Sequence, residues 1–418
     1  MNFFKSLSIY TLTSMLNAGV PFLLLPVLTY YLTSEEYGLL AIIQIFIVFT
    51  IPLISINIQS TLQLEYHELD QNEFAIWVSS VLLIPIVAVV IVSLLFVLLE
   101  SYINQFLNIS FLWLLIIPLI AFMQIIPQTI LAIYKISERP ISFAKYQLAM
   151  TFFNFILTLC FIIVMHLKWE GRLFAILGAV SFFTMIGLYL LRKMQLIVFY
   201  VKKEYIRKAL QLGLPLILHV VGALLFMMSD RLFISYFLGN KALGIYAVGA
   251  QVAMFAMIVQ ESFNQAWVPY LFKNLKIGLL ENKIKIIKIS YVSILFFMIL
   301  PFIIELVNPL IFSLLIDDKF LDSMKYVFWI AMGYSFLGMY KVITNYIFYE
   351  KRVYILSMMT FFSLLINLVL NYIFIHKYGS IGVAYGTVIT VGIFFLIAFV
   401  VANRVHKMPW LFFMRGKK

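Results

Sequence analysis

The chain has 418 residues, of which 64% are hydrophobic and only 11% are charged, and its mean hydropathy is +1.04. This composition excludes an ordinary soluble domain and predicts an all-α integral membrane protein. The net charge of +12 does not require a nucleic-acid partner, because basic loops beside an anionic leaflet are usual in membrane proteins. The single cysteine, Cys160, excludes an internal disulfide, and the five scattered histidines indicate no metal site.

Twelve stretches of the chain are apolar enough and long enough to span a membrane, which takes about 20 residues. Met1–Ser14 lacks a cleavable signal-peptide pattern, so we expect the first span to direct its own insertion. Lys288 and Glu305 are expected to shorten the ninth span. Prolines inside several spans predict kinks, which are either tolerated or used as hinges. The predicted spans are 8–31, 37–60, 75–99, 111–134, 141–166, 173–191, 209–235, 243–268, 286–308, 325–349, 353–375 and 379–403.

The distribution of Lys and Arg predicts the orientation. With the N-terminus in the cytoplasm, the cytoplasmic segments carry 22 of these residues and the outer loops carry 6, with Arg172 counted among the latter. Arg231 and Lys341 lie inside spans and complete the total of 30. This bias predicts a multi-pass protein with both termini in the cytoplasm.

The most basic loop, 192–208, divides the chain into two halves with six spans each. We therefore expect two six-helix bundles, 1–200 and 201–418, related by a parallel pseudo-two-fold repeat. A similar segment joins the first two spans of each half, and its Gly38 and Gly244 are 206 positions apart. Chance similarity between apolar sequences is the alternative. The fifth span of each half also has one polar face, made of Gln147, Thr151, Asn154 and Thr158 in the first half and of Thr360, Ser363, Asn367 and Asn371 in the second.

Asp230 and Arg231 lie inside the seventh predicted span. Each charge at the bilayer centre costs roughly 2.5–3.5 kcal/mol on insertion scales, so both side chains are expected to face protein or a water-filled cavity. Adjacent residues do not face each other on a helix, so the two are not expected to neutralise each other directly. His219 precedes Asp230 by eleven residues and lies on nearly the same helix face.

Arg231 and Lys341 are two cationic positions at different predicted depths, which suits an anionic group that crosses the membrane. The alternative, which does not exclude the first, is that they form structural ion pairs with Asp230 and Glu261. Amide side chains from both halves favour a shared hydrophilic interior, although each one alone could serve interhelical hydrogen bonding. The amides expected to bind substrate are Asn17, Gln128, Asn154, Gln265, Asn345, Asn367 and Asn371.

Four sequence elements, spread over most of the chain, carry a resemblance to a known family. They are Pro26–Gly38; Gly213–Pro215 with Asp230-Arg231 and Leu243–Tyr246; Gln265–Tyr270; and Asn367–Asn371 with Tyr378–Thr387. Together they resemble the Wzx-type O-antigen and polysaccharide flippases, the polysaccharide-transport branch of the multidrug/oligosaccharidyl-lipid/polysaccharide (MOP) exporter superfamily.

The resemblance implies two six-helix, MATE-like bundles around a central cavity. It also implies a flippase, not an enzyme, that moves an undecaprenyl-pyrophosphate-linked oligosaccharide to the outer leaflet of the bacterial inner membrane, as in lipopolysaccharide biosynthesis. Arg231 and Lys341 would take the pyrophosphate and sugar, and a polysaccharide polymerase and a chain-length regulator would be partners. No cofactor is implied beyond a proton or sodium gradient, for which Asp230, Glu261 and His219 are the coupling candidates.

Three other functions remain as alternatives. A multidrug antiporter of the same superfamily would share the fold, but such proteins often use buried acids, and the first span has none. A facilitator-type sugar transporter usually has a basic loop between spans two and three, whereas 61–74 holds four acidic residues and no Lys or Arg. A membrane polymerase or glycosyltransferase usually has a long outer loop with catalytic charges, and no such loop is predicted here.

Overall fold

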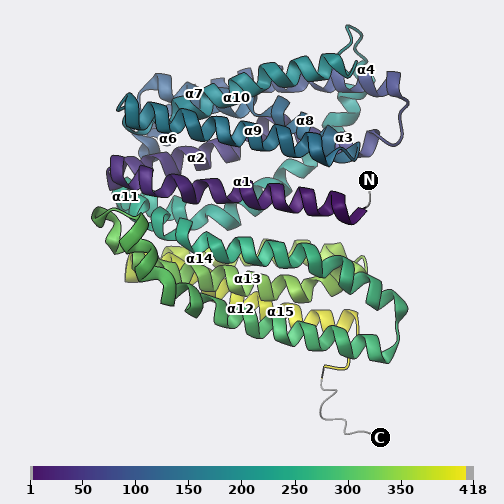
Figure 1. The fold of residues 1–418 in the computed structure, drawn as a ribbon, viewed down its shortest axis with the longest axis vertical. Coiled ribbons are helices and arrows are strands. Elements are labelled where there is room, and N and C mark those ends of the chain that lie inside the picture. Colours follow the sequence, from purple (N-terminus) through teal and green to yellow (C-terminus); the bar gives the residue numbers. More distant parts are fainter. Residues whose placement is uncertain (1–2, 411–418) are drawn as a thin grey trace, which may run out of the picture. The chain divides into compact units, whose positions relative to one another are not determined.

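The computed structural model describes residues 3–410, with side chains from Ser8 onward, and these residues are almost entirely helical and contain no strand (Figure 1). The predicted all-α membrane fold is therefore confirmed. The elements are α1 (Phe3–Tyr31), α2 (Ser34–Ser55), α3 (Ile58–Glu65), α4 (Gln71–Val81), α5 (Leu83–Leu98), α6 (Glu100–Leu107), α7 (Phe111–Met123), α8 (Ile125–Ile136), α9 (Pro140–Leu159), η1 (Cys160–Val164), α10 (Lys168–Lys193), α11 (Lys203–Ile277), α12 (Leu280–Leu315), η2 (Asp318–Ser323), α13 (Met324–Tyr349), α14 (Val353–Tyr378) and α15 (Ser380–Val405).

Within the described residues, eleven helical stretches are long and apolar enough to cross a membrane. One of them, α11, has 75 residues and is interrupted at Gly239, whose φ of 80° and ψ of 173° are not helical. The seventh and eighth predicted spans lie on either side of this interruption, which accounts for twelve crossings. The helix α12 continues through Lys288 and Glu305 for 36 residues, so these charges do not end it, and the expected shortening of the ninth span stays a prediction.

The chain forms two compact units. The first contains the residues up to Met228 together with Gly239–Gly244, and the second contains Ser229–Leu238 and the residues from Ile245 onward. In the first unit α9 packs against α1 and α10, and α2 packs against α7 (Figure 1). In the second unit α13 packs against α12 and α15, and α14 packs against α15. The expected bundle boundary at residue 200 stays a prediction.

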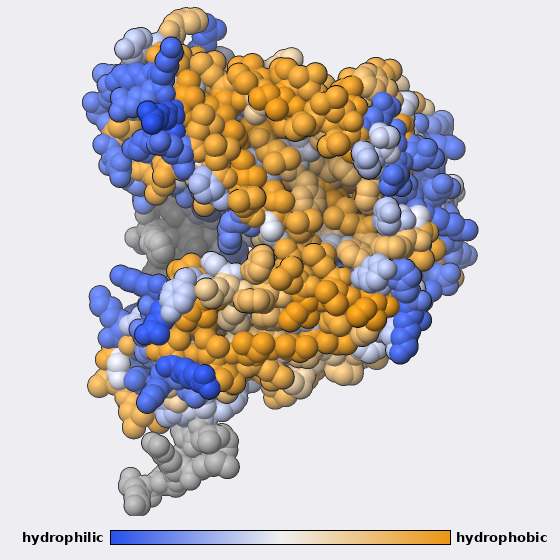
Figure 2. All heavy atoms as spheres, turned by 180° about the vertical axis from the view of Figure 1, so that it is seen from behind, coloured by the Kyte–Doolittle hydropathy of each residue, from blue (hydrophilic) through white to orange (hydrophobic). Residues whose placement is uncertain are grey.

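The surface of each unit is suited to lipid. Large apolar side chains on the outside include Leu98, Leu218 and Leu306, which are 75%, 80% and 82% exposed. Figure 2 shows, on the face that it draws, an apolar surface in each unit with hydrophilic residues gathered at its two ends. Contact of so much apolar surface with water would be unfavourable, whereas the hydrocarbon of a bilayer accommodates it. The chain is therefore a multi-pass integral membrane protein.

The predicted span at 111–134 is built from two helices, α7 and α8, and the break between them at Gln124 lies three residues before Pro127. Proline has no N–H, so Pro127 leaves the carbonyl of Met123 without its helical donor. The Thr184 hydroxyl donates to this carbonyl at 2.6 Å. A neighbouring helix thus satisfies the freed backbone group, as is required in hydrocarbon.

The two glycines that the repeat makes equivalent lie against each other in the first unit. A Cβ on Gly38 would be 1.8 Å from the Asn240 carbonyl oxygen, and one on Gly244 would be 1.8 Å from the Ser34 carbonyl oxygen. Ser34 and Asn240 are also 206 positions apart, so the contact is reciprocal. A local two-fold axis produces this kind of contact, which supports the predicted duplication.

Gly38→Ala and Gly244→Ala should each destabilise the protein by about 1–3 kcal/mol, because the added methyl group would overlap a backbone carbonyl that cannot move aside cheaply. Thermal unfolding of the purified protein in detergent measures this effect. Gly222→Ala is the matched control, since a Cβ at Gly222 meets nothing within 4 Å. Equal unfolding temperatures for all three variants would show that the close approach does not exist.

Candidate functional site

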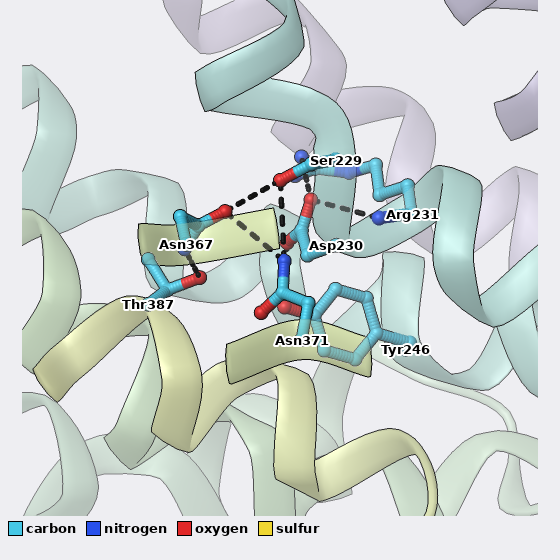
Figure 3. A network of polar contacts seen from close by, with 7 residues as sticks. All are labelled: Ser229, Asp230, Arg231, Tyr246, Asn367, Asn371 and Thr387. Atoms are coloured by element: carbon cyan, nitrogen blue, oxygen red, sulfur yellow. Dashed lines mark hydrogen bonds and ion pairs between the residues drawn. The ribbon is translucent and has the colours of Figure 1, made fainter. Parts of the chain in front are cut away.

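The second unit contains a polar network that joins α11, α14 and α15 (Figure 3). Asn367 and Asn371 lie four residues apart, so they share one face of α14. Both are fully buried and meet Ser229 of α11, which is 2% exposed. Gly386 of α15 allows the close packing here, because a Cβ at this position would lie 2.7 Å from the Asn371 side-chain oxygen.

The hydrogen bonds of the two asparagines centre on Asn367 Oδ1. It accepts from the Ser229 hydroxyl at 2.7 Å and from Asn371 Nδ2 at 3.0 Å. Asn371 Nδ2 also donates to Ser229 Oγ at 3.2 Å, and Asn367 Nδ2 donates to Thr387 Oγ1 at 3.4 Å. Asn371 Oδ1 is buried and accepts no hydrogen bond from a described residue. The network therefore has one spare acceptor, a costly feature for a buried polar group.

Asp230 adjoins this network and is 9% exposed. One carboxylate oxygen accepts from the Tyr246 hydroxyl at 2.6 Å, and the other accepts from the Arg231 backbone N–H at 2.8 Å. The latter oxygen also lies 3.4 Å from Arg231 Nη1. The expectation that Asp230 and Arg231 would not neutralise each other is therefore wrong. The long arginine side chain bends back to its neighbour, which spacing along a helix does not reveal.

Lys341 forms an ion pair with Glu261, which joins α13 to α11 within the second unit. One turn further along α13, Asn345 is buried and donates to Asn264 Oδ1 at 2.8 Å. Lys341, Glu261 and Asn345 are thus brought together. Gln265, one residue after Asn264, is exposed.

Polar side chains of the first unit surround a cavity of about 440 Å³ between α1, α8, α9 and α10. Asn17 Oδ1 accepts from Gln147 Nε2 at 3.0 Å and from the Thr151 hydroxyl at 2.5 Å. Gln128 Oε1 accepts from Gln59 Nε2 at 3.3 Å. The structure thus places Asn17, Gln128 and Asn154, all expected from the sequence, around one cavity.

Arg172 also lines this cavity, and sequence reasoning missed it. The positive-inside count assigned it to an outer loop, but it lies inside α10, which begins at Lys168. Arg172 Nη1 donates to Asn154 Oδ1 and to Thr158 Oγ1, both at 2.6 Å. The signal available in the sequence was the polar face of the neighbouring span, which contains both partners.

His219, the third expected coupling residue, belongs to the first unit. Its side chain is exposed and makes no hydrogen bond to another described residue. The structure therefore does not join His219 to the polar clusters described above.

Sequence comparison relates the chain to a protein family and to two proteins of a bacterium. Residues 3–275 match the model of a family described as "Polysaccharide biosynthesis protein". The chain is 24% identical over 383 residues to "Lsg locus putative protein 1" of Haemophilus influenzae, which covers 88% of this chain and 90% of that protein. A second Haemophilus influenzae protein, described as "Uncharacterized membrane protein", is 25% identical over 378 residues. The alignment covers 88% of this chain and 89% of that protein.

Solved structures share the fold at low identity. The lipid II flippase MurJ in an inward closed conformation aligns with 94% of this chain and 87% of its own, with a TM-score of 0.74 and 16% identity. An inward-facing multidrug resistance MATE family transporter of the MOP superfamily aligns with 93% and 94%, with a TM-score of 0.68 and 14% identity. The MATE-like fold expected from the sequence is confirmed, as is the resemblance to this superfamily. The match over residues 3–275 shows that the chain belongs to the polysaccharide biosynthesis protein family.

Proposed function

We propose that the chain is a flippase for a lipid-linked glycan. Its substrate would be an undecaprenyl-pyrophosphate-linked oligosaccharide, such as an O-antigen repeat unit, moved to the outer leaflet of the bacterial inner membrane. The observation that carries the proposal is membership of a polysaccharide biosynthesis family in a chain with the fold of a lipid II flippase over 94% of its length. Both termini would lie in the cytoplasm, and a polysaccharide polymerase and chain-length regulator would act after it.

The pyrophosphate is the part of this substrate that is hardest to move through hydrocarbon, because burying an unpaired charge costs several kcal/mol or more. The lipid tail can remain in the bilayer, so only the head group needs a polar path. Arg231 and Lys341 would meet the phosphates, each released from the acidic residue that it pairs with at rest. Charge-assisted bonds to phosphate are strong enough to replace those with carboxylates. Asn345, Asn367, Asn371 and Gln265 would provide neutral donors and acceptors along this path.

Asp230 is the coupling residue that we favour if transport uses a proton or sodium gradient. Its carboxylate is buried, and its neighbour in the chain, Ser229, bonds to Asn371, which carries the spare acceptor (Figure 3). Oxygen atoms from carboxylate, amide and hydroxyl groups suit a hard cation, and a carboxylate also suits a proton. Glu261 is exposed and would be the secondary candidate.

A multidrug antiporter is the second candidate, because MATE transporters share the fold. A cationic drug requires acidic groups in its binding cavity. The polar residues that line the cavity described in the first unit are amides, a threonine and an arginine, and no acidic residue lines it. This lining favours an anionic or glycan substrate over a cationic drug.

Arg231→Ala and Lys341→Ala should each reduce surface glycan about tenfold or more, because each removes a charge-assisted contact worth about 1.5–3 kcal/mol. Surface glycan is measured in the native strain without its chromosomal copy, with membrane protein amount checked by immunoblot. Lys319→Ala is the matched control, since Lys319 is a partly exposed cation outside both clusters. Full glycan in the double variant would refute the role of these two cations.

Asp230→Asn should lower glycan export while the protein stays folded, because the amide has a similar shape but carries no charge and does not titrate. Export in energised membrane vesicles, with and without an imposed proton or sodium gradient, measures the coupling. Glu305→Gln serves as control, since Glu305 is an exposed acid on α12. If the variant keeps the gradient dependence of the wild type, Asp230 is not the coupling residue.

A further inference from the structure

Arg172 differs in its hydrogen-bond and ion-pair partners from Arg231 and Lys341, the two cations of the candidate site in the second unit. Arg231 and Lys341 each contact a carboxylate, at Asp230 and Glu261. Arg172 contacts only neutral atoms, and no carboxylate of a described residue lies within ion-pair distance of it. A charge in a membrane-spanning helix without a counter-charge is costly. The site therefore favours an anion from outside the chain.

The guanidinium group also has unused hydrogen-bonding capacity. Arginine carries five N–H donors in a planar fork. Both described bonds, to Asn154 and Thr158, start from Nη1. The Nη2 and Nε donors make no hydrogen bond to a described residue. Two donors in such a geometry match the two oxygens of a phosphate or a carboxylate.

Asn154 and Thr158 hold the guanidinium group in place from the polar face of α9. The cavity next to it is large enough for a small ligand, since its volume is about 440 Å³ and binding pockets begin near 300 Å³. Its other polar walls are the side chains of Asn17, Gln124, Gln128, Gln147 and Thr151. Amides of this kind can donate to an oxyanion and can also bond sugar hydroxyls.

We propose that the Arg172 cavity is an oxyanion site within the first unit, which binds a phosphate or carboxylate group of the transported head group. This proposal rests on the flippase function for the source of the anion, but the site itself is a property of the first unit. Diphosphate of the lipid carrier and the carboxylate of an acidic sugar are the two sources. Arg172 receives the anion through its free donors, and the amides orient the attached group.

The test is direct binding to purified full-length protein in detergent. Inorganic pyrophosphate and glucuronate are titrated at constant ionic strength by calorimetry, with glucose as the neutral probe. Arg172→Gln should weaken binding about tenfold or more, as expected for the loss of a charge-assisted contact. Lys168→Gln is the matched control, because it removes a cation from the same helix at a residue that does not line the cavity. If Arg172→Gln weakens the binding of only one of the two anionic probes, that probe identifies the source of the anion.

A second variant tests the site even if Arg172→Gln does not fold. Asn154→Asp keeps the shape of the residue that contacts Arg172 and supplies the missing counter-charge. It should raise the unfolding temperature of the ligand-free protein and abolish binding of both probes. The proposal is overturned if the wild type shows no saturable binding, or if Arg172→Gln and Asn154→Asp bind as tightly as the wild type.

The two proposals fail separately. A wild-type chain that binds pyrophosphate through Arg172 but does not restore surface glycan would refute the flippase function and leave the oxyanion site intact. Restored glycan together with binding that does not depend on Arg172 would refute the oxyanion site alone.

Discussion

The absence of water inside a bilayer is the constraint on which the rest of this structure depends. Polar groups in the membrane-spanning helices therefore need partners inside the protein. Some find them within their own helix, as the Thr29 hydroxyl does at the Leu25 carbonyl, and others find them between helices, as at Met123, whose carbonyl accepts from Thr184 of another helix. The same demand draws Asn367 and Asn371 into a fully buried network with Ser229. Polar residues thus help to determine which helix faces meet, and large apolar residues cover much of the outer surface.

Three cations of the membrane-spanning helices have two kinds of partner. In the second unit Arg231 and Lys341 are each matched by an acid, at Asp230 and at Glu261. In the first unit Arg172 is held by an amide and a hydroxyl instead. Ion pairs can open to admit a competing anion, whereas an unmatched cation attracts one at rest. These are two complementary ways for a membrane protein to accept an anionic head group.

Much of the fold could be predicted from the sequence, because spans are long apolar runs and their signal is local. The repeat was also visible, and the reciprocal contact of Gly38 and Gly244 supports it. The candidate site was predicted less well. Asp230, Asn367 and Asn371 were identified as polar residues at costly positions, but their partners Tyr246 and Ser229 were not. Arg172 was missed because it lies close to the start of α10. At such a position the sequence alone does not show whether a residue belongs to a loop or to a helix that lines a cavity.

The sequence by itself determined that this chain is a membrane protein, which segments form its helices and which residues are too polar to face lipid. These properties follow from composition and local periodicity. Only the tertiary structure decided which of those residues meet. The bending of the Arg231 side chain back to Asp230 and the position of Arg172 beside Asn154 depend on side-chain rotamers and helix packing. The rotamer of Arg231 and the packing of α9 against α10 are set in the folded structure, and therefore no local pattern in the sequence encodes them.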